Sequence, residues 1–164
     1  MKYVLIGKIV NTHGLKGEVR ILSSFKFKNK VFIPNMKIYI GKDKLEEKIV
    51  TYRHHKVFEM ITMDGYTNID EVLKYKGEYV FINKDDLTLD KNEYLDEDII
   101  GLNVYTNDKI VGTIKKIENH NGNEILIVTN TNKNYLIPYN FDIILDVNLE
   151  KKEMRVKNIP GLFD

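Results

Sequence analysis

The chain has 164 residues, a hydrophobic fraction of 43% and a formal net charge of +1, values typical of a globular protein with one sizeable domain or two small ones. It contains no cysteine, which excludes disulfides, thiolate metal sites and cysteine nucleophiles. No apolar run approaches the roughly 20 residues of a membrane helix, and residues 1–10 lack the cleavage site of a signal peptide, so we expect a cytoplasmic protein.

The first predicted element is a hairpin in the segment GKIVNTHGLKGEVRI, residues 7–21. Apolar residues alternate with others in the first strand, and Val19 and Ile21 lie on one side of the second, which is the pattern of two paired strands. Between the strands, Gly14 and Gly17 bracket two residues. Glycine reaches positive φ without a Cβ clash, so this spacing predicts a tight turn.

His13 stands immediately before this turn, and three roles are open for it. It can hydrogen-bond the backbone of the turn, or it can stack on an RNA base or meet a phosphate. It can also act in catalysis, although Glu18 is the only nearby acid that could serve as its partner.

Residues 23–35 are expected to form a loop in which aromatic and basic residues are interleaved. Lysine supplies phosphate affinity without sequence choice, and exposed aromatic rings stack on unpaired bases. Phe25 and Phe27 can serve in this way or belong to the core. Together with the hairpin, the loop predicts an RNA-contacting surface, whose candidate residues are His13, Lys16, Arg20, Lys26, Lys28 and Lys30.

Four further strands and one helix are predicted in the first half. The strands are expected at residues 36–40, 49–52, 57–63 and 79–82. The helix is expected at residues 67–76, with Thr67 as its cap and acidic residues in its first turn. We expect a turn at residues 53–56, in which the adjacent His54 and His55 do not share a metal ion.

The composition changes at residues 85–98, where DDLTLDKNEYLDED holds seven acidic residues and one lysine without regular periodicity. This segment is predicted to be a linker. Beyond it, strands are expected at residues 102–105, 111–118, 125–129, 135–137, 143–147 and 153–156. Asn121-Gly122 between two apolar runs is a strong hairpin signal, and the close spacing of short strands predicts a second small antiparallel barrel.

The near-zero total charge conceals two halves of opposite sign. Residues 1–85 carry 16 Lys and Arg against 10 Asp and Glu, whereas residues 86–164 carry 9 against 14. A basic half suits a phosphate backbone and an acidic half suits a basic protein. Two alternatives stay open, namely that the halves attract one another or that the charges are simply solvated.

The chain resembles the RimM family of ribosome maturation factors. Residues 7–21 resemble the family's N-terminal signature, and EYLDEDIIGLNVY at residues 93–105, Gly112, LIPY at residues 136–139 and the closing PGLFD resemble its PRC barrel. The resemblance implies a mainly β fold with an N-terminal six-stranded β-barrel that contains one short helix and, after a linker, a second barrel. The implied ranges are 1–85 for the first barrel, 86–98 for the acidic linker and 99–164 for the PRC barrel, which begins at about residue 93 by the family's usual boundary.

The resemblance also implies a function. Members of this family bind the immature small ribosomal subunit and assist assembly of its head and processing of small-subunit rRNA, without catalysing a reaction. The PRC barrel binds small-subunit ribosomal protein nineteen, a head protein. We therefore expect a cytoplasmic monomer that uses no metal ion, cofactor or membrane.

The family's partner-binding residues include a pair of adjacent aromatic residues, usually tyrosines, before an Asp and a Gly at the start of the PRC barrel. This chain matches at Tyr94, Asp98 and Gly101, but it has Leu95 in place of the second aromatic residue. The resemblance therefore assigns ribosome or ribosomal-protein binding to Tyr94, Asp98 and Gly101, and to Leu95 with loss of the ring. The alternative is that Tyr94 and Leu95 seal the end of the barrel.

Two other classes of function were weighed. An RNA-modifying or RNA-cleaving enzyme needs an acid, a base or a metal cluster in fixed geometry, and the sequence offers none. A generic PRC-barrel interaction module is the second alternative. The hairpin around His13 argues against it, because that signature belongs to the ribosome-associated proteins.

Overall fold

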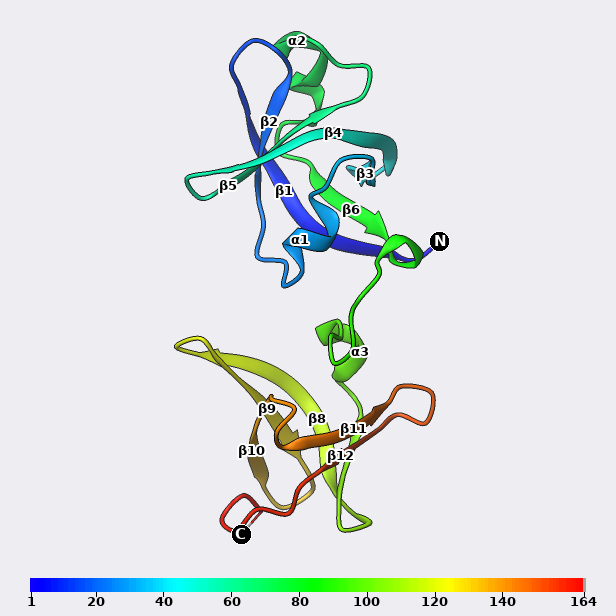
Figure 1. Ribbon diagram of the computed structural model, residues 1–164, viewed down its shortest axis with the longest axis vertical. Helices are drawn as coiled ribbons and strands as arrows, with labels where there is room; N and C mark the ends of the chain where they lie inside the picture. Colours follow the sequence, from blue (N-terminus) through cyan, green and yellow to red (C-terminus); the bar gives the residue numbers. More distant parts are fainter. Residues whose placement is uncertain (164) are drawn as a thin grey trace. The chain divides into compact units, whose positions relative to one another are not determined.

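The computed structural model describes residues 1–163, so the last residue of the predicted PRC barrel lies outside the described residues. The chain divides into two compact units, Met1–Leu89 and Asp90–Asp164. Strands dominate both units and the helices are short, which confirms the predicted mainly β fold class (Figure 1). None of the helices in the described part of the chain is long and apolar enough to cross a membrane.

The first unit is a closed barrel of six antiparallel strands in the order β1-β2-β5-β4-β3-β6. Its strands are β1 (Tyr3–His13), β2 (Glu18–Leu22), β3 (Lys37–Ile40), β4 (Leu45–His55), β5 (Phe58–Met63) and β6 (Tyr79–Asn83). β1 pairs with β2 on one side and with β6 on the other, and a bulge interrupts each pairing. Bulges bend and twist a strand, which helps β1 to close the barrel (Figure 1).

Alternation of side chains along these strands fills the barrel. Ile9, Val19, Ile21 and Ile61 have no exposed surface. Burying such a side chain stabilises the fold by about 1.5–3 kcal/mol. The predicted strands of this half are therefore confirmed. Period-two alternation is a property of neighbouring residues, so it predicts a strand whichever strands pair with it.

The predicted helix at residues 67–76 is wrong in its start and its regularity. The structure has α2 (Ile69–Val72) followed by a 3-10 turn, η1 (Leu73–Tyr75). Asn68, and not Thr67, is the cap: its side chain accepts a hydrogen bond from the Glu71 amide, while the Glu71 carboxylate accepts one from the Asn68 amide. A capping box of this kind satisfies two backbone donors at once.

Two other expectations of the first half are corrected. The predicted loop at residues 23–35 contains a short helix, α1 (Lys28–Val31), held by burial of Phe27, Val31 and Phe32. The turn expected at residues 53–56 begins later, since β4 continues to His55. A further 3-10 turn, η2 (Lys84–Asp86), follows β6.

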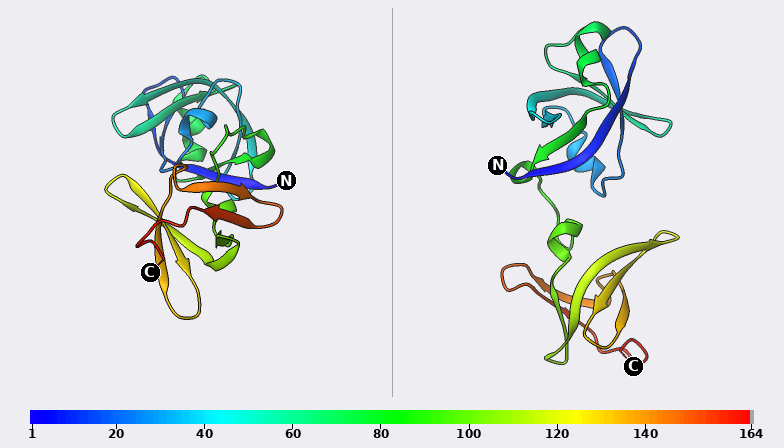
Figure 2. Two further views of the ribbon diagram at one scale, coloured as in Figure 1. Left: turned by 60° about the horizontal axis from the view of Figure 1, so that its bottom comes forward. Right: turned by 180° about the vertical axis from the view of Figure 1, so that it is seen from behind.

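The second unit is a six-stranded sheet in the order β10-β9-β8-β7-β12-β11. Its elements are α3 (Asp96–Ile99), β7 (Asn103–Thr106), β8 (Lys109–His120), β9 (Asn123–Thr129), β10 (Asn134–Pro138), β11 (Ile144–Asn148) and β12 (Glu153–Val156). The sheet differs from the antiparallel prediction in one pair, because β12 runs parallel to β7. The β8–β9 turn has positive φ at both Asn121 and Gly122, as its sequence predicts, and β8 is long and strongly bent (Figure 2).

Candidate functional site

The turn between β1 and β2 is fixed by its two glycines and by the segment before α2. Gly14 and Gly17 have φ of +66° and +90°. A Cβ on Gly17 would lie 3.3 Å from the carbonyl oxygen of Asn68, and the Ile69 amide donates to the Leu15 carbonyl at 2.9 Å. The turn is therefore packed closely against the start of α2, which leaves Lys16 exposed at its tip.

One group of side chains lies on the outer face of β1, β2, β5 and β4, which are neighbours in the barrel. Because Val19 and Ile21 point into the core, the alternate residues of β2 point outward. The outward residues of β4 and β5 join them from the neighbouring hairpin. We call this group the hairpin cluster: His13, Glu18, Arg20, Arg53, His55 and Phe58.

Arg20 is the centre of the hairpin cluster. Its Nη2 lies 2.6 Å from His13 Nδ1, and its guanidinium lies over the Phe58 ring at 5.6 Å from the centroid. Since a guanidinium only donates, His13 Nδ1 accepts and the proton of its ring is on Nε2. The ring of His55 is 6.1 Å from that of His13. The expected bond of His13 to the turn backbone is thus replaced by a side-chain bond to Arg20.

The charges of the hairpin cluster are unequal. Arg53 donates to both carboxylate oxygens of Glu18, at 2.9 and 2.8 Å, and this bond holds the pKa of Glu18 below its usual value. Burial lowers the pKa of His55, and the nearby positive charges of Arg53 and Lys56 lower it further. The carboxylate of the cluster is therefore already paired with Arg53, which leaves Arg20 as the cation of the cluster without a carboxylate partner among the described residues.

The structure brings together only part of the predicted RNA surface. His13 and Arg20 meet in the hairpin cluster, whereas Lys26, Lys28 and Lys30 lie at α1, away from the β1–β2 turn (Figures 1 and 2). His55 and Phe58 were not predicted to belong to a site. Only the pairing of β2 with β5 brings them to Arg20, and no local pattern in the sequence carries that information.

A second polar group, built around Glu59, lies near α1. Glu59 is 1% exposed, and its Oε1 accepts from the Tyr52 hydroxyl at 2.7 Å and lies 2.9 Å from His54 Nδ1. Lys28 lies 3.8 Å from the other oxygen. Lys28 therefore has a structural partner, which makes it a weaker RNA candidate than its sequence context indicates.

The predicted partner-binding residues of the second unit lie around α3. Tyr94 is half-buried and stacks on Phe141 with ring centroids 6.2 Å apart. Leu95 is 6% exposed, so its side chain seals the interior and offers little surface to a partner. Asp98 lies within α3, and Gly101 follows it with φ of +98°. Of the pair, only Tyr94 has a ring that a partner can reach.

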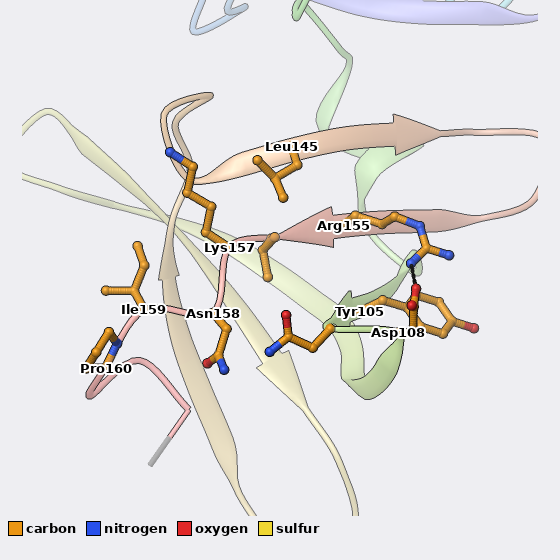
Figure 3. A pocket seen from close by; sticks show the side chains of 10 residues that line it. Tyr105, Asp108, Leu145, Arg155, Lys157, Asn158, Ile159 and Pro160 are labelled. Atoms are coloured by element: carbon orange, nitrogen blue, oxygen red, sulfur yellow. Dashed lines mark hydrogen bonds and ion pairs between the residues drawn. The ribbon is translucent and has the colours of Figure 1, made fainter.

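An open hollow of about 660 Å³ lies elsewhere in the second unit (Figure 3). Arg155 Nη1 donates to Asp108 Oδ1 at 2.9 Å there, and its guanidinium lies 5.2 Å from the centroid of the Tyr105 ring. The hollow contains none of the predicted site residues. Within residues 1–163, no three His, Asp or Glu side chains gather in a way that could hold a metal ion.

Comparison with known protein families shows to which family the chain belongs. The model of the RimM N-terminal domain matches residues 4–87, and that of the RimM PRC barrel domain matches residues 96–162. The chain belongs to the RimM family. Both halves of the resemblance seen in the sequence are thereby confirmed, in the same order along the chain.

Individual RimM proteins match over nearly their full length. The protein named Ribosome maturation factor RimM from Bacillus mycoides is 38% identical over 168 residues, which cover 98% of each chain. The protein of the same name from Staphylococcus haemolyticus is 37% identical, with 98% of this chain and 99% of the relative covered. A crystal structure described as a putative 16S ribosomal RNA processing protein RimM from Pseudomonas aeruginosa is 23% identical, with a TM-score of 0.48 over 96% of this chain and 98% of that one.

Proposed function

We propose that the chain is a ribosome maturation factor that binds the immature small ribosomal subunit and assists assembly of its head and processing of its rRNA. The observation that carries this proposal is the presence of both RimM domains, in order, in a chain that is 36–38% identical over 98% of its length to proteins named Ribosome maturation factor RimM. The proposal includes action as a cytoplasmic monomer.

The charges of the two units support a division of labour. Met1–Leu89 has a net charge of +5 and Asp90–Asp164 a net charge of −4, counting Lys and Arg against Asp and Glu. The basic unit suits rRNA, and the acidic unit suits a basic ribosomal protein such as small-subunit ribosomal protein nineteen. Tyr94, with Asp98 and Gly101, is the proposed contact to that protein, and the buried Leu95 contributes little surface to it.

The proposed mechanism needs binding energy only. A factor that binds the native arrangement of RNA and protein better than other arrangements shifts the population of particles toward the native one. It leaves when the contacts of the mature subunit compete for the same surface. No bond is made or broken by the chain, so purified protein is expected to leave precursor rRNA uncut and unmodified.

The test is co-sedimentation of the full chain with small subunits purified from cells in which assembly is stalled. The wild-type protein is expected to travel with immature subunits and much less with mature ones. Tyr94→Ala should reduce binding about thirtyfold, because an aromatic anchor at an interface contributes about 2 kcal/mol, whereas Tyr94→Phe keeps the ring and most of the binding.

Tyr135→Ala is the matched control, since Tyr135 is also half-buried in the second unit and packs its ring on Phe163 at 5.5 Å. Equal binding by wild type and Tyr94→Ala would reject Tyr94 as a contact. Turnover of precursor rRNA by the purified chain alone would support an RNA-modifying or RNA-cleaving enzyme instead.

A further inference from the structure

We propose that the hairpin cluster binds a phosphodiester of single-stranded RNA, with Arg20 as its cationic contact and the His55 ring as a second contact. This inference rests on the proposed binding of rRNA by the first unit and says where on that unit a strand is held. It adds His55 and Phe58, from the β4–β5 hairpin, to a surface that the sequence places in the β1–β2 hairpin and the loop that follows it.

The first support is the balance of charge. Arg20, Arg53 and Lys56 supply three positive charges in this region against one carboxylate, Glu18, and Arg53 already occupies both oxygens of that carboxylate. Among residues 1–163, Arg20 has no ion pair to a carboxylate; its polar partner is a histidine nitrogen. An anion from outside the chain would supply the missing charge.

The second support is the way in which Arg20 is held. The Phe58 ring lies beneath its guanidinium and His13 binds one of its terminal nitrogens, so the side chain is fixed before any ligand arrives. A guanidinium whose orientation is already set loses little entropy when it binds a phosphate.

The third support is the presence of rings beside the charges. The imidazoles of His13 and His55 are 6.1 Å apart and half-buried, and the exposed tips of both hairpins carry a lysine, Lys16 and Lys56. A carboxylate of a protein partner would use the guanidinium alone. A single-stranded nucleotide uses both features, because its phosphate meets the cations and its base stacks on a flat ring.

The test measures binding of a fluorescent 12-nucleotide oligouridine to the full chain by anisotropy, at several salt concentrations. Arg20→Gln is expected to weaken binding about tenfold, which is the loss of a charge-assisted hydrogen bond. It should also make the slope of log K against log salt shallower by about 0.7, the value for one lost contact to a single strand. His55→Gln should weaken binding about fivefold, which corresponds to the loss of about 1 kcal/mol of stacking on a base.

Lys37→Gln is the matched control, because it removes the same charge from an exposed position on β3, outside the hairpin cluster. It is expected to stay within about twofold of the wild type. If Arg20→Gln and His55→Gln both bind as the wild type does, the inference is overturned while RNA binding by the first unit stands. If the wild-type chain does not bind the oligonucleotide, the inference fails together with the proposed RNA binding by the first unit.

Two further readouts keep the inference testable if Arg20→Gln does not fold. In the wild-type chain, the imidazole NMR signals of His13 and His55 should shift on titration with the oligonucleotide, while those of His120, which lies in the other unit, should not. Unmoved His13 and His55 signals would contradict the inference. Tighter binding of a polyglutamate peptide than of the oligonucleotide would overturn it in favour of an acidic protein partner.

Discussion

The two glycines of the β1–β2 turn have left-handed backbone conformations but different surroundings. Both have positive φ, and the sequence predicts this from their spacing alone. Their surroundings differ, because Gly14 has no atom within 4 Å of an added Cβ, whereas Gly17 has three backbone atoms of Tyr66 and Asn68 within 3.5 Å. Only the packing of the turn against the start of α2 makes a side chain harder to accommodate at Gly17 than at Gly14.

Gly17→Ala is therefore expected to destabilise the first unit by about 2 kcal/mol, and Gly14→Ala by about 1 kcal/mol. The smaller value is the cost of a left-handed conformation alone, and the larger one includes the close contact with Asn68. Urea unfolding of the two variants measures the difference. Equal losses would show that the turn moves away from α2 without cost.

Glu59 is the residue whose surroundings the sequence conceals most completely. Its charge suggests a surface residue of β5, yet it is 1% exposed because it faces the inside of the barrel on the same side as Ile61, with Ile21 beside it on β2. Burial, the hydrogen bond to Glu59 and its charge together raise the pKa of Tyr52 to about 12. Burial, assisted by the carboxylate, thus keeps the phenol protonated above its ordinary range.

Tyr52 is expected to titrate near pH 12 in the wild type and at a lower pH in Glu59→Gln, which removes the charge of Glu59 but leaves the burial that raises the pKa most. A folded-state pKa above the unfolded value stabilises the fold fully below pH 10, and this contribution is lost as the pH rises from about 10 to about 12. Carbon-13 labelling of the tyrosine rings resolves the phenol by NMR. An unchanged titration in Glu59→Gln would mean that burial alone sets the pKa.

At the scale of elements, strands were predictable and short helices were not. Period-two alternation marks a strand locally, which is why the strands of both halves are found at the predicted positions. α1 has four residues and no side-chain cap, and it exists because Phe27 and Phe32 at its ends are buried. The start of α2 depends on which of two adjacent polar residues faces the Glu71 amide, a choice made by the packing of the chain.

Asn68→Ala is expected to lower the stability of the first unit by about 1 kcal/mol, the usual cost of losing a cap. Thr67→Ala should cost less than about 0.5 kcal/mol, although Thr67 is the cap that the sequence predicts. Thermal unfolding of both variants compares them directly. A larger loss for Thr67→Ala would restore the sequence-based assignment.

At the scale of the whole molecule, two units of opposite charge make up the chain. The hairpin cluster and the lysines of α1 belong to the unit with a net charge of +5, and Tyr94 belongs to the unit with a net charge of −4. Each unit has its own buried core. The charge pattern is readable from the sequence, whereas the assembly of His13, Arg20 and His55 into one cluster is not.

Residues 1–89, expressed alone, are expected to bind single-stranded RNA weakly and with steep salt dependence, whereas residues 90–164 are expected not to bind it. Their opposite charges are the physical reason. Anisotropy titrations at 50 and at 200 mM salt make the comparison, after circular dichroism has verified that each fragment is folded. RNA binding by the acidic fragment would contradict the proposed division of partners.

The sequence by itself determined the mainly β class, the strand positions, the glycine turn and the family, because these depend on local alternation, on backbone preference and on the order of motifs along the chain. Tertiary structure decided the rest. The β2–β5 pairing brought His55 and Phe58 to Arg20 and His13, and thereby added the β4–β5 hairpin to the candidate RNA site. These contacts join residues more than 30 positions apart, and no local signal in a sequence records which distant strands will become neighbours.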